Sequence, residues 1–186
     1  MKPTGKHIFR LAIILFFSFH CTIPTYSQVK HIILVSIDGL RPEMYLDKSW
    51  STPNLRYLMK NGTYADHMKS VFPAYTFPSH TAMITGALPA RSKICYNQPT
   101  GSKGEWNWDV NLIKVPTLWQ AMHNNKLTTA AIMWPGATNG DIDYNLAESW
   151  ELSTPDDRIS KTRKTGTPGL VDEIEINATG KLDSTN

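Results

Sequence analysis

The chain has 186 residues, with 19 lysines and arginines against 16 aspartates and glutamates, which gives a formal net charge of +3. All of this excess lies in the first 27 residues, where Lys2, Lys6 and Arg10 occur without an acidic residue, so residues 28–186 are formally neutral. This neutrality argues against a nucleic-acid surface or a charged membrane patch, and the basic stretch 158–164 is interpreted as a solvated loop.

The first 27 residues are typical of a signal peptide. The three basic residues precede an apolar run, Leu11–Phe19, which is too short to span a bilayer. The sequence before Gln28 offers small residues to a signal peptidase, whereas the residues before Cys21 form a poor lipoprotein site. We therefore predict cleavage after Ser27 and export to the periplasm or the extracellular space, with no membrane span afterwards. An uncleaved anchor is the alternative.

Cleavage at this position would leave Cys95 as the only cysteine. An exported chain without a cysteine pair is not a disulfide-built mini-protein and needs an ordinary hydrophobic core. Residues 28–186 are numerous enough to form such a core as one domain, or as part of a larger one.

The remaining sequence alternates between strand and helix patterns. His31–Ile37 is a continuous apolar run, which predicts a central strand covered on both faces. Thr52 and Pro53 predict the start of a helix that Gly62 ends. Further along we expect a strand at 64–71, a helix at 78–85, an irregular loop at 97–109, a helix at 117–124 and a buried strand at 128–133.

After this last strand, the sequence Trp134-Pro135-Gly136 predicts a sharp break. From Asp141 onward the sequence is polar and shows no clear period. The order of the elements predicts an α/β fold with a mostly parallel sheet, in which ligands bind beyond the carboxyl ends of the strands. Asp38, Thr76 and the 134–136 break would all lie at this edge.

Asp38 and Thr76 form the main candidate site. Asp38 follows the first predicted strand, and Thr76 precedes a predicted helix. Taken singly, Asp38 could be a turn residue beside Gly39, and Thr76 could be a helix N-cap. Taken together, they supply an anionic ligand for a cation and a hydroxyl that the cation can activate as a nucleophile. The helix start would add N–H groups and a positive dipole end for a phosphate.

The sequence resembles the nucleotide pyrophosphatase/phosphodiesterase family of the alkaline phosphatase superfamily. The resemblance covers roughly residues 30–136, and the matching motifs occur in the family order. They are Ser36-Ile-Asp-Gly-Leu-Arg-Pro42, Thr52-Pro-Asn-Leu55, Asn61-Gly-Thr-Tyr-Ala65, Phe72-Pro73, Thr76-Phe-Pro-Ser-His80, Thr85-Gly86, Asn97 and Trp134-Pro-Gly136.

The resemblance implies an alkaline-phosphatase-like α/β/α sandwich with a mostly parallel central sheet. It also implies two zinc ions, one of them bound by Asp38, and Thr76 as a metal-bound nucleophile that becomes phosphorylated. Asn97 matches an asparagine that hydrogen-bonds a phosphate oxygen, and Phe77 matches an aromatic residue that stacks on a nucleobase. Read without the family, Asn97 is a polar loop residue and Phe77 a core aromatic.

Two further residues have weaker assignments. Trp150 is a candidate for the second face of the base site, although its alignment requires gaps. His80 lies four residues after Thr76 and matches a family position that we interpret as structural. We expect its ring to face the body of the helix and not the metals.

The match to the family is incomplete. A two-zinc site needs about six ligands besides the nucleophile, and the downstream Asp-x-x-x-His, Asp-His and lone-His motifs of the family do not occur here. Arg91-Ser-Lys93 also replaces a usual His-Gly. We therefore interpret residues 28–186 as the N-terminal part of a catalytic domain, with 141–186 as the possible start of a cap or insertion, and expect the isolated segment to be poorly folded and inactive.

The predicted function is thus exported, zinc-dependent hydrolysis of small phosphodiester or nucleotide pyrophosphate substrates. The alternatives are another phosphohydrolase of the superfamily, such as a phosphomonoesterase, and a non-catalytic remnant.

Overall fold

The computed structural model describes residues 30–153 and 158–182. The predicted signal peptide lies outside these residues. The chain divides into two compact units, residues 1–37 and residues 38–186, and the second contains the helices and strands described below. Within the described residues, no helix combines the length and the apolar character needed to cross a membrane.

Two predicted strands do not form. Residues 31–37 contain neither helix nor strand, and their apolar side chains are exposed, Ile33 by 86%. Residues 64–71 are likewise without strand structure. A strand needs neighbours that pair with its N–H and C=O groups, and a buried strand needs cover on its faces. Neither segment has a ladder partner within the described part of the chain, so the prediction of a central strand at His31–Ile37 is wrong for this structure.

The helices follow the predictions more closely. The helices predicted at 52–62, 78–85 and 117–124 correspond to α3, α4 and α6. The segment 97–109 is an irregular loop, as predicted, except for one isolated bridge residue. In chain order the helical elements are α2 (Glu43–Leu46), α3 (Pro53–Asn61), α4 (Thr76–Thr85), α5 (Pro89–Ser92), the 3₁₀ turn η1 (Val110–Leu112), α6 (Leu118–Asn124), α7 (Arg158–Thr165), α8 (Leu170–Ile174) and the π-helical segment η2 (Glu175–Thr179).

Local sequence signals define the ends of these helices. Pro53 is the first residue of α3, where its missing N–H costs nothing. Gly86 ends α4 with φ 64°, a left-handed conformation that glycine adopts without a Cβ clash. Thr117 caps α6 in a capping box, since its hydroxyl accepts from Gln120 N–H and the Gln120 side chain accepts from Thr117 N–H.

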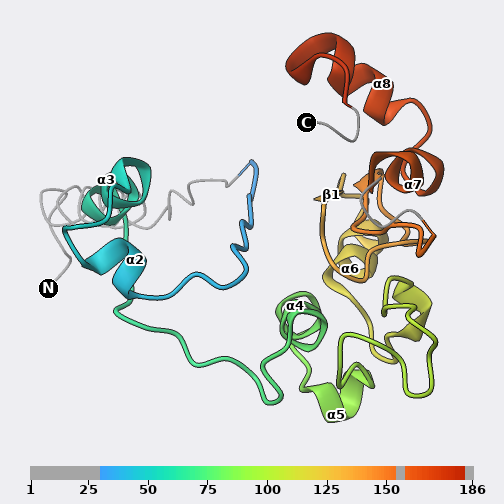
Figure 1. Ribbon diagram of the computed structural model, residues 1–186, viewed down its shortest axis with the longest axis horizontal. Helices are drawn as coiled ribbons and strands as arrows, with labels where there is room; N and C mark the ends of the chain where they lie inside the picture. The colour runs from blue at the N-terminus through green and yellow to red at the C-terminus, as the bar shows by residue number, and fades with distance from the viewer. Residues whose placement is uncertain (1–29, 154–157, 183–186) are drawn as a thin grey trace, which may run out of the picture. The chain divides into compact units, whose positions relative to one another are not determined.

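A small parallel sheet lies in the second half of the chain. β1 (Ala130–Ile132) confirms the strand predicted at 128–133, and it pairs with β2 (Tyr144–Leu146) in the register Ala131 to Asn145. The break at 134–136 follows β1, and Gly136 has φ 77°. Helices α7 and α8 contact β2, and α6 lies close to the two strands (Figure 1).

Residues after 141 were expected to be a polar tail without a clear period, but they contain β2, α7 and α8. Nonlocal contacts explain the difference. Thr167 pairs with the second edge of β2, because its N–H donates to Asn145 C=O and its hydroxyl accepts from Asn145 N–H, at 2.8 and 2.9 Å. A three-residue strand gives too short a pattern to be recognised alone.

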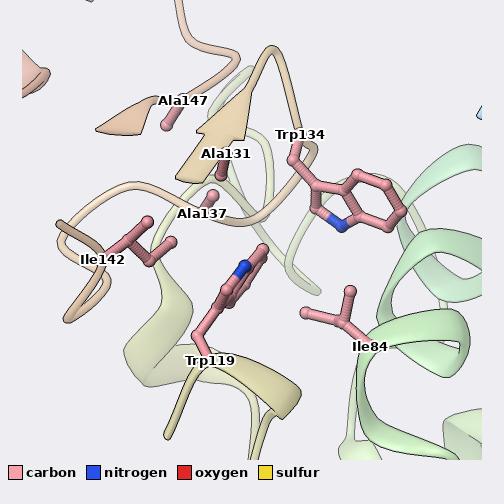
Figure 2. Close-up of a cluster of buried hydrophobic side chains, with 7 residues drawn as sticks. All are labelled: Ile84, Trp119, Ala131, Trp134, Ala137, Ile142 and Ala147. Atoms are coloured by element: carbon pink, nitrogen blue, oxygen red, sulfur yellow. The ribbon is translucent and has the colours of Figure 1, made fainter. Parts of the chain in front are cut away.

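A cluster of buried apolar side chains joins α4, α6 and the sheet. Figure 2 shows Trp119 of α6 and Ile84 of α4 near Trp134, which follows β1. The two indole rings meet edge to face, with centroids 6.4 Å apart. The other members are small or aliphatic and allow these elements to approach closely: Ala131, Ala137, Ile142 and Ala147. This packing fixes α4, which carries Thr76, on the rest of the α/β unit.

The link between Asp143 and Thr129 makes the stability of this unit pH-dependent. Asp143 Oδ2 accepts from Thr129 N–H and hydroxyl at 2.7 and 3.0 Å, and these hydrogen bonds lower the pKa of Asp143. A carboxyl group whose pKa is lowered on folding stabilises the fold above its unfolded pKa, about 3.9, and this contribution disappears as the pH falls through the folded pKa.

We therefore expect the melting temperature to decrease as the pH is lowered past about 4. The decrease should be less steep in Asp143→Asn, because the wild type loses the charge of Asp143 in acid whereas the variant has no charge at this position to lose. Thermal unfolding followed by circular dichroism between neutral and acid pH measures the difference. Asp66→Asn is the matched control, because Asp66 is exposed and its carboxylate accepts no hydrogen bond from the described residues. Parallel acid profiles for wild type and Asp143→Asn would contradict the assignment.

Candidate active site

Thr76 is the first residue of α4, and its hydroxyl is not used as a cap. The N-cap position belongs to Tyr75, whose backbone is extended. The Thr76 hydroxyl instead donates to Asp38 Oδ2 at 3.1 Å, across 38 residues of sequence. The interpretation of Thr76 as an N-cap is therefore wrong, and the structure brings the two main candidate residues together.

Asp38 is a turn residue and also a partner of Thr76. It shares a turn with Gly39, which has φ 69°, so the local interpretation of the Asp-Gly pair is correct. Asp38 is exposed, and the turn directs its carboxylate to the start of α4. The result is an anionic oxygen beside a hydroxyl at a helix N-terminus, where the Thr76 N–H has no partner among the described residues and can bind a negatively charged ligand.

Asn97 is attached to the same helix start. Its side-chain Oδ1 accepts from the Phe77 backbone N–H at 3.0 Å, which satisfies one N–H that has no partner within the helix. Asn97 is thus more than a polar loop residue. Its Nδ2 donates no hydrogen bond to the described residues, so this amide can donate to a ligand at the helix N-terminus.

A cavity of about 580 Å³ opens next to Asn97. Residues 96–102 line it together with Tyr75 and Trp106. Tyr75 and Tyr96 pack against each other, with ring centroids 5.5 Å apart. None of the residues that line this cavity carries a charge. The cavity therefore suits the uncharged part of a ligand whose other part contacts Thr76.

Phe77 and Trp150 do not face each other across an open gap. The Phe77 side chain is only 1% exposed and packs against Trp106 at 5.7 Å. Trp150 packs edge to face against Trp106 and Trp108, at 5.1 Å from each. In this arrangement Phe77 fits its interpretation as a core aromatic, and Trp106 separates it from Trp150. The nucleobase role of both residues stays a prediction.

His80 faces the body of its helix, as expected. Its Nδ1 lies 2.7 Å from the Thr76 carbonyl oxygen, and its ring meets the Trp134 ring edge to face at 5.2 Å. The side chain is buried. Since a carbonyl oxygen only accepts, the Nδ1 of His80 carries the proton and donates it in this contact.

Two residues near the site were not recognised in the sequence. Trp106 was only part of a loop rich in Gly, Asn and Trp, and the pair of tryptophans in this loop, Trp106 and Trp108, was the available signal. Glu148 follows β2 and lies 3.8 Å from Arg158. Burial raises the pKa of Glu148, Arg158 and His80 act in the opposite direction, and the charge of Asp38 adds to the rise. Because β2 was not predicted, Glu148 had no structural context.

Asp38 and Thr76 place two oxygen atoms that could act as metal ligands next to each other. Zinc binds oxygen ligands at about 2.0–2.2 Å in tetrahedral geometry, which places two such oxygens about 3.3–3.6 Å apart. The 3.1 Å between Thr76 Oγ1 and Asp38 Oδ2 is a hydrogen-bond distance and is shorter than this spacing. Among the residues that the structure describes, no group of three or more His, Cys, Asp or Glu side chains gathers at a point that could hold a metal ion.

Known proteins with similar sequences match about two thirds of this chain. Bis(5'-adenosyl)-triphosphatase enpp4 of Mus musculus is 33% identical over 135 residues, which cover 68% of this chain and 29% of that protein. Ectonucleotide pyrophosphatase/phosphodiesterase family member 3 of Rattus norvegicus is 31% identical over 138 residues, covering 67% and 15%. Family member 1 of Homo sapiens is 27% identical over 130 residues, covering 66% and 14%. The chain thus spans less than a third of the length of each relative.

The family model described as type I phosphodiesterase / nucleotide pyrophosphatase matches residues 32–175, well over half of the chain. This segment contains Asp38, Thr76, Phe77, Asn97 and Trp150. The match confirms the predicted alkaline-phosphatase-like α/β class, of which the parallel β1–β2 pair and its helices are an incomplete example. The chain belongs to the type I phosphodiesterase / nucleotide pyrophosphatase family.

Proposed function

We propose that this protein is an exported, metal-dependent hydrolase of phosphodiester or nucleotide pyrophosphate bonds with Thr76 as its nucleophile. The observation that carries the proposal is the hydrogen bond between the Thr76 hydroxyl and Asp38 at the N-terminus of α4. The names of the relatives describe enzymes that act on such bonds. Export rests on the sequence of residues 1–27.

In the proposed reaction each residue has a defined role. The Thr76 N–H at the start of α4 and the Nδ2 amide of Asn97 hydrogen-bond the non-bridging oxygens of the phosphoryl group. Asp38 orients the Thr76 hydroxyl towards the phosphorus. The Thr76 hydroxyl gives up its proton, a bond from its Oγ to phosphorus forms while the bond to the leaving alcohol or phosphate breaks, and the leaving oxygen takes up a proton in exchange. Water then hydrolyses the phosphothreonine and restores the hydroxyl.

Zinc bound by Asp38 and Thr76 would supply a Lewis acid that favours the ionised Thr76 hydroxyl. These two residues fit only part of a two-zinc site. We propose that the remaining ligands belong to the part of the family domain that residues 32–175 do not cover.

A direct assay tests the proposal. The protein produced from its native gene is expected to release p-nitrophenolate from bis(p-nitrophenyl) phosphate, and to lose this activity when a chelator removes zinc. Hydrolysis of p-nitrophenyl phosphate alone would instead indicate a phosphomonoesterase. If zinc-loaded protein hydrolyses neither ester, the protein is a non-catalytic remnant.

Asn97 offers a more specific prediction. Asn97→Ala is expected to lower turnover of the diester by about 100- to 1,000-fold, the usual cost of one lost transition-state donor, while bound zinc is unchanged. Asn97→Asp separates the two functions of this side chain, because it keeps an acceptor for Phe77 N–H but has no amide donor. We expect the turnover of Asn97→Asp to be as low as that of Asn97→Ala, and its melting temperature to equal that of the wild type. Wild-type turnover in Asn97→Asp would exclude the amide as a phosphate donor.

A further inference from the structure

The peptide group between Thr76 and Phe77 is held from both sides by side chains. Its carbonyl oxygen, on Thr76, accepts from His80 Nδ1 at 2.7 Å. Its N–H, on Phe77, donates to Asn97 Oδ1 at 3.0 Å. The two hydrogen bonds act on one planar unit, so they fix its orientation and polarise each other.

We propose that His80 is a positioning residue for Thr76 and acts through this peptide. The proposal rests on the proposed function, because it concerns the same nucleophile. The orientation of the peptide sets ψ of Thr76, and thereby the direction from which its hydroxyl reaches Asp38. A helix carbonyl already accepts a backbone N–H, so the additional bond from His80 is not needed to form the helix.

The surroundings of His80 restrict its ring to this role. The side chain is 6% exposed, and Trp134 meets the ring edge to face at 5.2 Å. Trp134 belongs to the buried cluster that joins α4 to α6 and the sheet. The start of α4 is therefore connected through His80 to the packed core, whereas Thr76 itself lies at the surface of this core.

Histidine can be compared with asparagine at this position. Asparagine Nδ2 lies at the same distance along the side chain as histidine Nδ1. Three asparagines among the described residues donate from Nδ2 to the carbonyl oxygen four residues earlier, with distances of 2.8 to 2.9 Å: Asn61 to Tyr57, Asn125 to Ala121 and Asn177 to Glu173. His80→Asn should thus keep the hydrogen bond to Thr76, and His80→Leu should remove it.

The test compares wild type, His80→Leu and His80→Asn in the protein produced from its native gene, with bis(p-nitrophenyl) phosphate as substrate. In His80→Leu we expect kcat to fall by up to about 100-fold, with KM and bound zinc unchanged. In His80→Asn we expect kcat within about threefold of wild type, because the donor is retained. Equal kcat in wild type and His80→Leu, or an equal loss in both variants, would overturn the proposal.

A second measurement does not depend on activity or on a variant that folds. Nitrogen-15 NMR of the imidazole in the wild-type protein should show His80 with its proton on Nδ1 at neutral pH. Protonation of Nε2 alone would overturn the proposal, since Nδ1 could then not donate to Thr76. A wild type that hydrolyses no phosphodiester would disprove the proposed function, while the NMR result would still decide whether His80 holds this peptide.

Discussion

Thr76→Ala is expected to lower the turnover of a phosphodiester by at least about 10,000-fold, because loss of a covalent nucleophile removes the whole two-step route. The helix should remain intact. Thr76 is the first residue of α4, alanine is a good helix former, and the lost hydroxyl contacts only the exposed Asp38 among the described residues. Steady-state kinetics and zinc content of the purified variant provide the measurement, and we expect the zinc content to stay near that of wild type.

Two matched variants separate chemistry from structure. Ser79→Ala removes another hydroxyl from the same helix, one that lies 3.2 Å from the Ser70 hydroxyl and takes no part in the proposed reaction. It should keep wild-type turnover. Thr76→Ser retains the nucleophilic oxygen and should keep a measurable fraction. Unaltered turnover in Thr76→Ala would remove this residue from the mechanism.

The helices could be predicted because their signals are local. Pro53, Gly86 and the Thr117 capping box each act within one turn of the helix that they begin or end. The strands depend on partners elsewhere in the chain. His31–Ile37 has an apolar strand pattern but no strand beside it among the described residues, whereas β2 forms with only three residues because β1 and Thr167 pair with its two edges.

Some features of the candidate site could likewise be predicted and others could not. The proximity of Asp38 and Thr76 was expected, because Asp38 follows a predicted strand and Thr76 precedes a predicted helix at one edge of a sheet. The structure brings the two residues together although the predicted strand before Asp38 does not form. The bond from Asn97 to the helix start and the choice of Trp106 as the packing partner of Phe77 could not be predicted from the residues, since both depend on the path of the 97–109 loop.

Asp38→Asn is expected to separate charge from hydrogen bonding at the proposed metal site. Asparagine keeps an oxygen that can accept from the Thr76 hydroxyl, so the 3.1 Å contact can persist. It removes the negative charge, and an amide oxygen is a weak zinc ligand. Because loss of a partner that only orients a ligand already costs about 10- to 100-fold in metal affinity, we expect zinc affinity to fall by at least about 100-fold.

This pattern of effects distinguishes a metal ligand from a residue that only orients the nucleophile. If Asp38 binds zinc, the Asp38→Asn protein should lose metal on dialysis and recover part of its turnover when zinc is added in excess. Asp66→Asn, which removes an exposed carboxylate from the same half of the chain, should retain metal and activity. Metal analysis after dialysis decides between the two roles. Equal zinc stoichiometry in wild type and Asp38→Asn, with turnover still reduced, would leave Asp38 as the partner of the Thr76 hydroxyl and would exclude it as a zinc ligand.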